Sequence, residues 1–199
     1  PLRLVGSEMC IRDSDMGGCF SGSALEYDGK HVIMYTGVLD NKDENGERVV
    51  RQTQCIAIGD GENYEKLECN PVITHEMLPE GSSLEDFRDP KIWREGEEFY
   101  CVVASRSNDG SGQILMYKSN NLKEWEFVTI VDNSKNKVGR MWECPDLFSL
   151  NGKGVLIISP QEVKATKDGF HNGSNTAYLI EKYDNEKKSF ERESCNVID

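Results

Sequence analysis

Residues 22–36 have the sequence Gly-Ser-Ala-Leu-Glu-Tyr-Asp-Gly-Lys-His-Val-Ile-Met-Tyr-Thr, in which an Asp-Gly pair separates two apolar runs. Such a pair is a strong short-range signal for a β-hairpin, because both residues tolerate the left-handed backbone of a tight turn. Residues 91–104 and 146–159 repeat the pattern around Gly96 and Gly152. The turn glycines of successive hairpins are 67 and 56 residues apart. The sequence therefore predicts one hairpin repeated with a long period.

Further strand signals follow each hairpin. Each set consists of an apolar run, a polar turn and a short final run, at residues 52–58 and 64–67, 113–119 and 125–127, and 176–181 and 189–190. Four strands per repeat is the make-up of a propeller blade. No long amphipathic helix pattern interrupts the series, which disfavours a parallel α/β sheet. We expect an all-β fold with about three blades of a β-propeller.

The composition limits the kinds of partner. The chain has 199 residues and a formal net charge of −12, which argues against binding a nucleic-acid backbone. No apolar run approaches the ~18 residues needed to cross a bilayer, and no secretory signal is visible. We therefore expect a neutral or weakly charged small-molecule partner, no nucleic acid or membrane partner, and a cytoplasmic location. The seven cysteines form no C-x-x-C pair and only three histidines occur, so no metal site or cofactor is expected.

The first fourteen residues differ from the rest of the chain. They show neither strand alternation nor a helical stripe, and the run from Val5 to Ser14 resembles translated sequencing-adapter sequence. We expect residues 1–14 to be non-native or disordered and the natural sequence to start near Asp15. Residues 15–199 are then part of a folded domain whose upstream portion is missing from this sequence.

Three polar strings stand in the same relation to the three hairpins. They are Gly18–Ala24, Phe87–Lys91 and Trp142–Asp146, and each comes just before the first strand of its hairpin. Innermost strands of a propeller run beside the central axis, so equivalent positions in successive blades meet at one mouth. Asp89 and Glu143 are therefore predicted to share a pocket, as glycosidic bond cleavage requires of two carboxylates. Taken singly, Glu143 could be a solvated loop acid, and Asp89 could belong to a structural ion pair or a turn.

The three strings resemble, in order, motifs of glycoside hydrolase family 32, which comprises invertases, sucrose-6-phosphate hydrolases and other β-fructosidases. The resemblance extends over about residues 15–199. It implies a five-bladed propeller, usually followed by a β-sandwich, and a retaining mechanism. Residues 15–199 would be part of the N-terminal propeller domain.

The resemblance also implies roles for the two acids. Glu143 corresponds to the general acid/base, which protonates the glycosidic oxygen and then activates water. Asp89 corresponds to the transition-state stabiliser, which accepts hydrogen bonds from fructose hydroxyls. Arg88 would donate to the sugar or hold Asp89 ionised.

Four neighbours complete the expected site. By the resemblance, Phe20 and Ser21 line the fructose pocket. Trp142 forms an aromatic wall or, equally well, packs in the core. Cys144 is either a small buried residue or a group that tunes Glu143.

One departure from the family pattern bears on activity. The family nucleophile is an Asp in a Trp-x-Asn-Asp-Pro-Asn-Gly-type string upstream of the Phe20 motif, and the sequence contains no such string. Asp13 and Asp15 lie too close to Phe20 and lack its context. We expect the parent protein to hydrolyse a fructoside, and this chain, without a nucleophile, to be inactive.

Two other functions remain open from the sequence. The first is another five-bladed glycosidase, active on arabinan or xylan, although such enzymes are not expected to carry both the Phe20–Ala24 string and Glu143-Cys144. The second is a non-catalytic carbohydrate-binding propeller with vestigial acids. The strings do not distinguish sucrose, sucrose 6-phosphate and fructans as the substrate.

Overall fold

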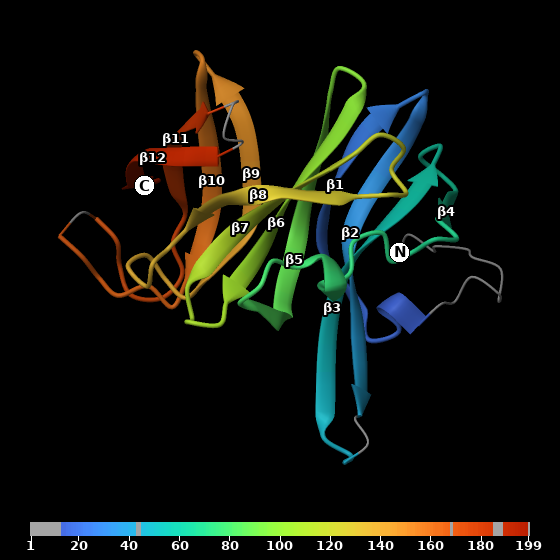
Figure 1. Cartoon of the computed structure of the whole chain (residues 1–199), viewed down its shortest axis with the longest axis horizontal. Helices are drawn as coiled ribbons and strands as arrows, with labels where there is room; N and C mark the ends of the chain where they lie inside the picture. The colour runs from blue at the N-terminus through green and yellow to red at the C-terminus, as the bar shows by residue number, and fades with distance from the viewer. Residues whose placement is uncertain (1–12, 43–44, 168, 185–188, 199) are drawn as a thin grey trace.

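The computed structural model describes residues 13–42, 45–167, 169–184 and 189–198. In this part of the chain twelve strands form three four-stranded antiparallel sheets that lie side by side, as Figure 1 shows from blue through green to red. The first sheet contains β1 (Gly18–Tyr27), β2 (Lys30–Lys42), β3 (Arg48–Gly59) and β4 (Tyr64–Lys66). The second contains β5 (Ser82–Glu95), β6 (Glu98–Ser107), β7 (Gly112–Ser119) and β8 (Glu126–Asn133). The third contains β9 (Met141–Leu150), β10 (Lys153–Gln161), β11 (Ala177–Asp184) and β12 (Ser189–Val197).

The order within each sheet follows the sequence, so each sheet is a four-stranded meander. This arrangement confirms the predicted all-β fold with three blades of a partial β-propeller. Two short 3₁₀ helices, η2 (Asp13–Asp15) and η3 (His75–Met77), lie outside the sheets. No helix in the described part of the chain is long and apolar enough to cross a membrane.

The three predicted hairpins are confirmed as tight two-residue turns. Tyr27 pairs with Lys30, and Leu150 pairs with Lys153 across the Asn151-Gly152 turn. Asn151 has a φ of 52° and Gly152 a φ of 78°, which is the left-handed backbone that such turns need. The Asn-Gly and Asp-Gly pairs therefore specify where the first two strands of a blade meet.

Two hydrophobic cores fill the spaces between the sheets. Strand β6 contributes to both, because its side chains alternate between its two faces. Cys101 and Val103 pack with the first sheet, whereas Val102 and Ala104 pack with the third. All four are fully buried. The continuous apolar run in β6 is thus explained by burial on both sides.

Among the first strands of the blades, β5 contacts both β1 and β9. Side chains connect them where backbone pairing does not. The hydroxyl of Ser23 donates to the carbonyl of Pro90 at 2.9 Å and accepts the Ile92 N–H at 2.8 Å, which joins β1 to β5. Lys91 forms an ion pair of 3.0 Å with Asp146, which joins β5 to β9.

A buried polar network connects β2 and β3 to the middle of β5. The Thr36 hydroxyl accepts the Asp89 N–H at 3.0 Å and donates to Oε1 of Gln54 at 2.8 Å. The amide of Gln54 donates to the carbonyl of Phe87 at 2.8 Å, and Oε1 of Gln52 accepts the Phe87 N–H at 2.9 Å. Thr36 and Gln54 are both fully buried, so these hydrogen bonds have no competition from water.

Each of the three inner strands carries a register shift at its site string. The shift in β1 falls between Phe20 and Gly22, and that in β5 between Arg88 and Lys91. The shift in β9 lies between Glu143 and Asp146, opposite Ile157 and Ser159 of β10. Such bulges turn a side chain away from the normal alternation and are common beside active sites.

The bulges also correct one expectation about strand boundaries. The sequence pattern places Asp89 and Glu143 at strand entrances. Glu143 is indeed the third residue of β9, but Asp89 is the eighth residue of β5. Pairing of β5 resumes beyond the bulge at Arg88 and, after a second register shift between Phe87 and Ser82, ends at Ser82. These irregularities interrupt the alternation that would have shown the continuation of the strand.

The predicted foreign segment falls mostly outside the described residues, which begin at residue 13. Ser14 is buried, and the carboxylate of Asp15 accepts the Tyr35 hydroxyl at 3.0 Å and forms an ion pair with Lys66. The boundary at residue 14 stays a prediction.

The variant Thr36→Val should lower the free energy of unfolding by about 2 kcal/mol, because it leaves the Asp89 N–H and Gln54 Oε1 buried without a partner. The matched control is Thr129→Val. Thr129 lies partly exposed on β8, and its hydroxyl makes one long contact, of 3.4 Å, to the carbonyl of Ile130. The free energy of unfolding should therefore change by less than about 0.5 kcal/mol. Urea unfolding measures both. Equal effects of the two variants would show that the buried network does not add to the stability of the fold.

Candidate active site

A hollow of about 720 Å³ lies at the bulges of the three inner strands. It is lined by Cys19, Phe20, Ser21, Arg88, Asp89, Glu143 and Cys144. Six of the seven candidate residues from the sequence therefore meet in one place, although they come from three different sheets. The exception is Trp142.

Asp89 links the second and third sheets. Its carboxylate accepts the backbone N–H of Cys144 at 3.1 Å and the thiol of Cys144 at 3.7 Å. Only 7% of Asp89 is exposed. Burial raises the pKa of Asp89, and the Glu143 carboxylate adds to this, whereas the Cys144 N–H and Arg88 act in the opposite direction.

Arg88 holds the second acid. Its Nε and Nη2 both donate to Oε1 of Glu143, at 3.1 and 2.7 Å. The Arg88 side chain is 16% exposed and that of Glu143 is 29% exposed, so the ion pair is partly shielded from water. Because both donors reach the same oxygen, the orientation of the Glu143 carboxylate is fixed while Oε2 receives no bond from Arg88.

Arg88 is itself held from the other side by Asp86. Nη1 of Arg88 lies 2.8 Å from Oδ1 of Asp86, and Arg106 forms a second ion pair with the same carboxylate. The four side chains Arg106, Asp86, Arg88 and Glu143 thus form a row of alternating charge. Charges arranged this way hold one another in position.

Cys144 is exposed at the hollow rather than buried in the core. Partial burial and the neighbouring Asp89 carboxylate raise the pKa of Cys144 to about 11. At neutral pH it is therefore a thiol that can donate to Asp89. Its φ of 47° and the φ of 61° at Asp89 lie in the left-handed region, which costs energy for residues other than glycine.

Trp142 does not line the hollow. It is fully buried in the core between the second and third sheets, and its indole N–H donates to the carbonyl of Val138 at 2.6 Å. The guanidinium of Arg192 lies 5.5 Å from the centre of its ring. Of the two interpretations of Trp142, the structure places it in the core. It lies next to Glu143 in β9, where successive side chains point to opposite faces.

Phe20 and Ser21 complete the opposite wall of the hollow. Phe20 is 48% exposed, so its side chain is accessible to a ligand in the hollow. Ser21 is the extra residue of the β1 bulge.

Sequence reasoning missed the supporting residues. Cys19 lines the hollow and lies within the quoted Gly18–Ala24 string, so its position beside Phe20 was the available signal. Asp86 lies two residues before Arg88, a spacing that puts both on one face of a strand. Arg106 had no local signal, because it reaches Asp86 only when β6 pairs with β5 in the folded chain. Among the described residues no group of three His, Cys, Asp or Glu side chains could hold a metal ion.

The family model for the glycosyl hydrolases family 32 N-terminal domain matches residues 8–199. The chain belongs to glycoside hydrolase family 32.

Several relatives of this family-32 chain are known. The sucrose-6-phosphate hydrolase of Bacillus subtilis is 35% identical over 93% of the chain and 38% of its own length. The raffinose invertase of Escherichia coli is 36% identical over 79% of the chain and 32% of its own length. The chain thus spans less than two fifths of these relatives.

Solved structures have a similar fold. The family-32 β-fructofuranosidase of Bombyx mori superposes with a TM-score of 0.81 and 36% identity, covering 95% of the chain and 39% of that protein. A family-43 β-xylosidase/α-arabinofuranosidase from a compost metagenome superposes with a TM-score of 0.62 at 13% identity, covering 90% of the chain and 58% of that protein, which shows likeness of fold alone.

The variant Asp89→Asn should stabilise the chain by about 1 kcal/mol at neutral pH. Burial raises the pKa of Asp89 in the folded state, so its ionisation costs stability once the pH exceeds the value for the unfolded chain. Asparagine avoids this cost, can still accept the Cys144 N–H, and tolerates the left-handed backbone.

Urea unfolding at pH 7 and pH 3 measures the effect, which should disappear at about pH 3, where Asp89 is protonated in both states. The exposed turn variant Asp28→Asn is the control and should change little at either pH. A loss of stability in Asp89→Asn at pH 7 would contradict the prediction.

Proposed function

We propose that this chain is part of a retaining β-fructosidase that hydrolyses the fructosyl bond of sucrose or sucrose 6-phosphate. The observation that carries the proposal is the meeting of Asp89 and Glu143 in one hollow, each bonded to the opposite strand. Relatives named sucrose-6-phosphate hydrolase and raffinose invertase support the substrate class. So does a Bombyx mori β-fructofuranosidase variant in complex with sucrose, 36% identical with a TM-score of 0.79 over 92% of this chain and 38% of that protein.

In the proposed mechanism Glu143 is the general acid/base. It protonates the oxygen that leaves with the glucosyl unit, and as a carboxylate it then removes a proton from the water that attacks the fructosyl intermediate. Arg88 fixes the orientation of Glu143 through Oε1, which leaves Oε2 for the substrate.

Asp89 is the proposed transition-state stabiliser. Its carboxylate is nearly buried, so its interaction with developing positive charge on the fructosyl ring is weakly screened. The Cys144 N–H and thiol hold it toward the hollow. Phe20 and Ser21 are the proposed contacts to the fructose ring.

The nucleophile of such a reaction is expected from a Trp-x-Asn-Asp-Pro-Asn-Gly-type string that the 199 residues do not contain. Asp15 is bound to Tyr35 and Lys66 and is no substitute. The proposal is therefore that the longer protein is active and that this chain binds fructose without turning over.

The alternative functions receive less support. The arabinan- or xylan-active alternative rests on a neighbour that shares the fold at 13% identity. A non-catalytic binding propeller would not need the ion pair that orients Glu143. A cytoplasmic location for the parent protein stays a prediction.

The decisive experiment uses the protein translated from the uninterrupted reading frame around this chain. It should release glucose from sucrose or glucose 6-phosphate from sucrose 6-phosphate, with retention at the fructosyl carbon. Glu143→Gln should lower kcat by about 10³-fold, because general acid/base catalysis is lost. Glu126→Gln, on the exposed edge strand β8, is the matched control. Full activity in Glu143→Gln would exclude the proposed role.

The chain itself should bind fructose weakly and release no glucose from sucrose. Calorimetry measures the binding, which Asp89→Ala should abolish while the exposed turn variant Asp60→Ala leaves it unchanged. Turnover of sucrose by residues 1–199 at the rate of the longer protein would refute the absence of a nucleophile.

A further inference from the structure

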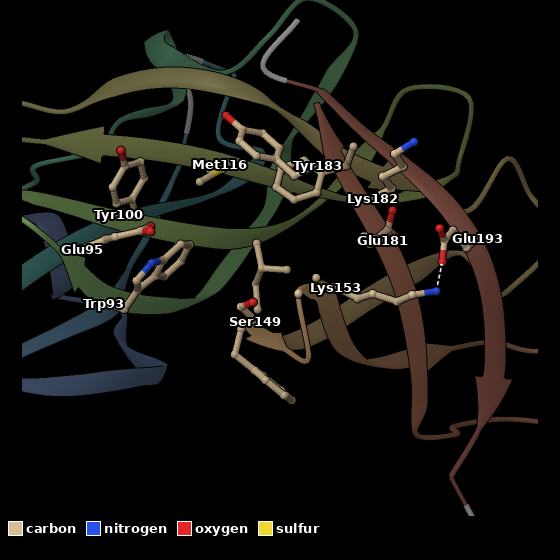
Figure 2. Close-up of a pocket in the computed structure, with 15 residues that line it drawn as sticks. Trp93, Glu95, Tyr100, Met116, Ser149, Lys153, Glu181, Lys182, Tyr183 and Glu193 are labelled. Atoms are coloured by element: carbon tan, nitrogen blue, oxygen red, sulfur yellow. Dashed lines mark hydrogen bonds and ion pairs between the residues drawn. The ribbon is translucent and has the colours of Figure 1, made fainter. Parts of the chain in front are cut away.

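A second hollow, also of about 720 Å³, lies between the second and third sheets. Glu95, the last residue of β5, and Ser149, near the end of β9, belong to its wall. The candidate active site contains Asp89 and Glu143, each six residues earlier in the same two strands, and the two hollows share no lining residue. Figure 2 shows the second hollow with side chains from both sheets directed toward its interior. Its volume is in the range of small-molecule sites.

Aromatic rings line this hollow from both sheets. Trp93 stacks on Tyr100 with ring centres 5.7 Å apart and planes 20° apart. Tyr183 packs on Phe190 with ring centres 4.6 Å apart. In Figure 2 Trp93 and Tyr100 lie on one side and Tyr183 on the other. Flat apolar surfaces with polar tips suit ligands that have both C–H faces and hydroxyl groups.

An unusual carboxyl group belongs to the wall of the hollow. Glu181 is 0% exposed, and its carboxyl lies beside the carboxyl of Asp132, which is its hydrogen-bond partner. Burial, followed by the nearby carboxyl of Asp132, raises the pKa of Glu181 to about 9. At neutral pH the Glu181 carboxyl is therefore neutral, donates to Asp132 and adds no charge to the wall of the hollow.

The residue paired with Glu181 leaves room beside it. Gly154 faces Glu181 across the β10–β11 ladder, and a Cβ at Gly154 would lie 3.4 Å from that of Glu181. Both residues belong to the wall. Any larger residue at position 154 would narrow this part of the hollow.

Charges at the rim cancel. Lys153 forms an ion pair of 2.6 Å with Glu193, and Glu95 and Lys182 are the other charged residues of the wall besides Glu181. A charged ligand gains no net attraction from two cations and two anions, whereas a neutral ligand with many hydroxyls can use both donors and acceptors.

We propose that this second hollow binds a neutral saccharide, with Trp93 as the stacking surface and the charged side chains at the rim as hydrogen-bond partners. The proposal does not depend on the fructosidase function, because it uses none of the residues of the candidate active site.

Maltose and cellobiose are suitable probes, because neither contains the fructosyl unit that the candidate active site is proposed to bind. Titration of the ¹⁵N-labelled chain should shift the indole N–H signal of Trp93 and the amide signals of Ser149 and Gly154. A dissociation constant of about 1 mM is expected for at least one of the two sugars. The amides of Ser21 and Glu143 should not move.

A matched pair of variants tests the location. Ser149→Trp places a bulky ring in the hollow and should weaken binding about tenfold or more. Leu150→Trp adds the same ring one residue further on, where the side chain is 56% exposed and does not line the hollow, so affinity should stay within about twofold. Trp93→Ala should also weaken binding about tenfold through loss of stacking.

Three results would overturn the proposal. One is the absence of shifts with both sugars up to about 50 mM, in a chain whose spectrum is that of a folded protein. Another is a set of shifts confined to the candidate active site. The third is equal affinity in Ser149→Trp and Leu150→Trp, which also covers the case in which Trp93→Ala fails to fold.

Discussion

The geometry of the candidate active site depends on the hydrogen bonds that pass from Thr36 and Gln54 to the backbone of Phe87 and Asp89. β5 is an edge strand of its sheet and its bulge leaves Asp89 outside the ladder, so backbone groups here lack strand partners, and buried backbone groups must be paired. Side chains of the neighbouring sheet supply the missing partners. The same bonds therefore satisfy the bulge and set the distance between the first and second sheets.

The two acids are held by different means. Asp89 is nearly buried and is fixed by a backbone N–H of the next blade, so its position follows the backbone. Glu143 is more exposed and is fixed by Arg88, which Asp86 and Arg106 hold in turn. One acid thus depends on packing and the other on a row of charges. This division suits a reaction in which one carboxylate keeps its place while the other exchanges protons.

Much of the fold could be predicted from the sequence, because turn chemistry and alternation are local properties. The turn glycines Gly29, Gly96 and Gly152 located the hairpins, and each follows Phe20, Phe87 or Glu143 by nine residues, which aligned the blades. The bulges could not be predicted, since their residues carry no distinctive composition. Trp142 was ambiguous because a buried aromatic and an exposed one look alike in sequence. Arg106 and the second hollow depend on contacts between distant segments, which no local pattern records.

Because β6 is buried on both faces, the middle sheet holds the other two sheets together. Its neighbours each bury one face against it, while it buries both of its own. Both outer sheets, and with them both walls of the candidate active site, therefore pack on the middle sheet. Local unfolding of the middle sheet would separate Asp89 from Glu143 and unfold the rest of the chain with it. The fold and the arrangement of the two acids therefore depend on a single cooperative unit.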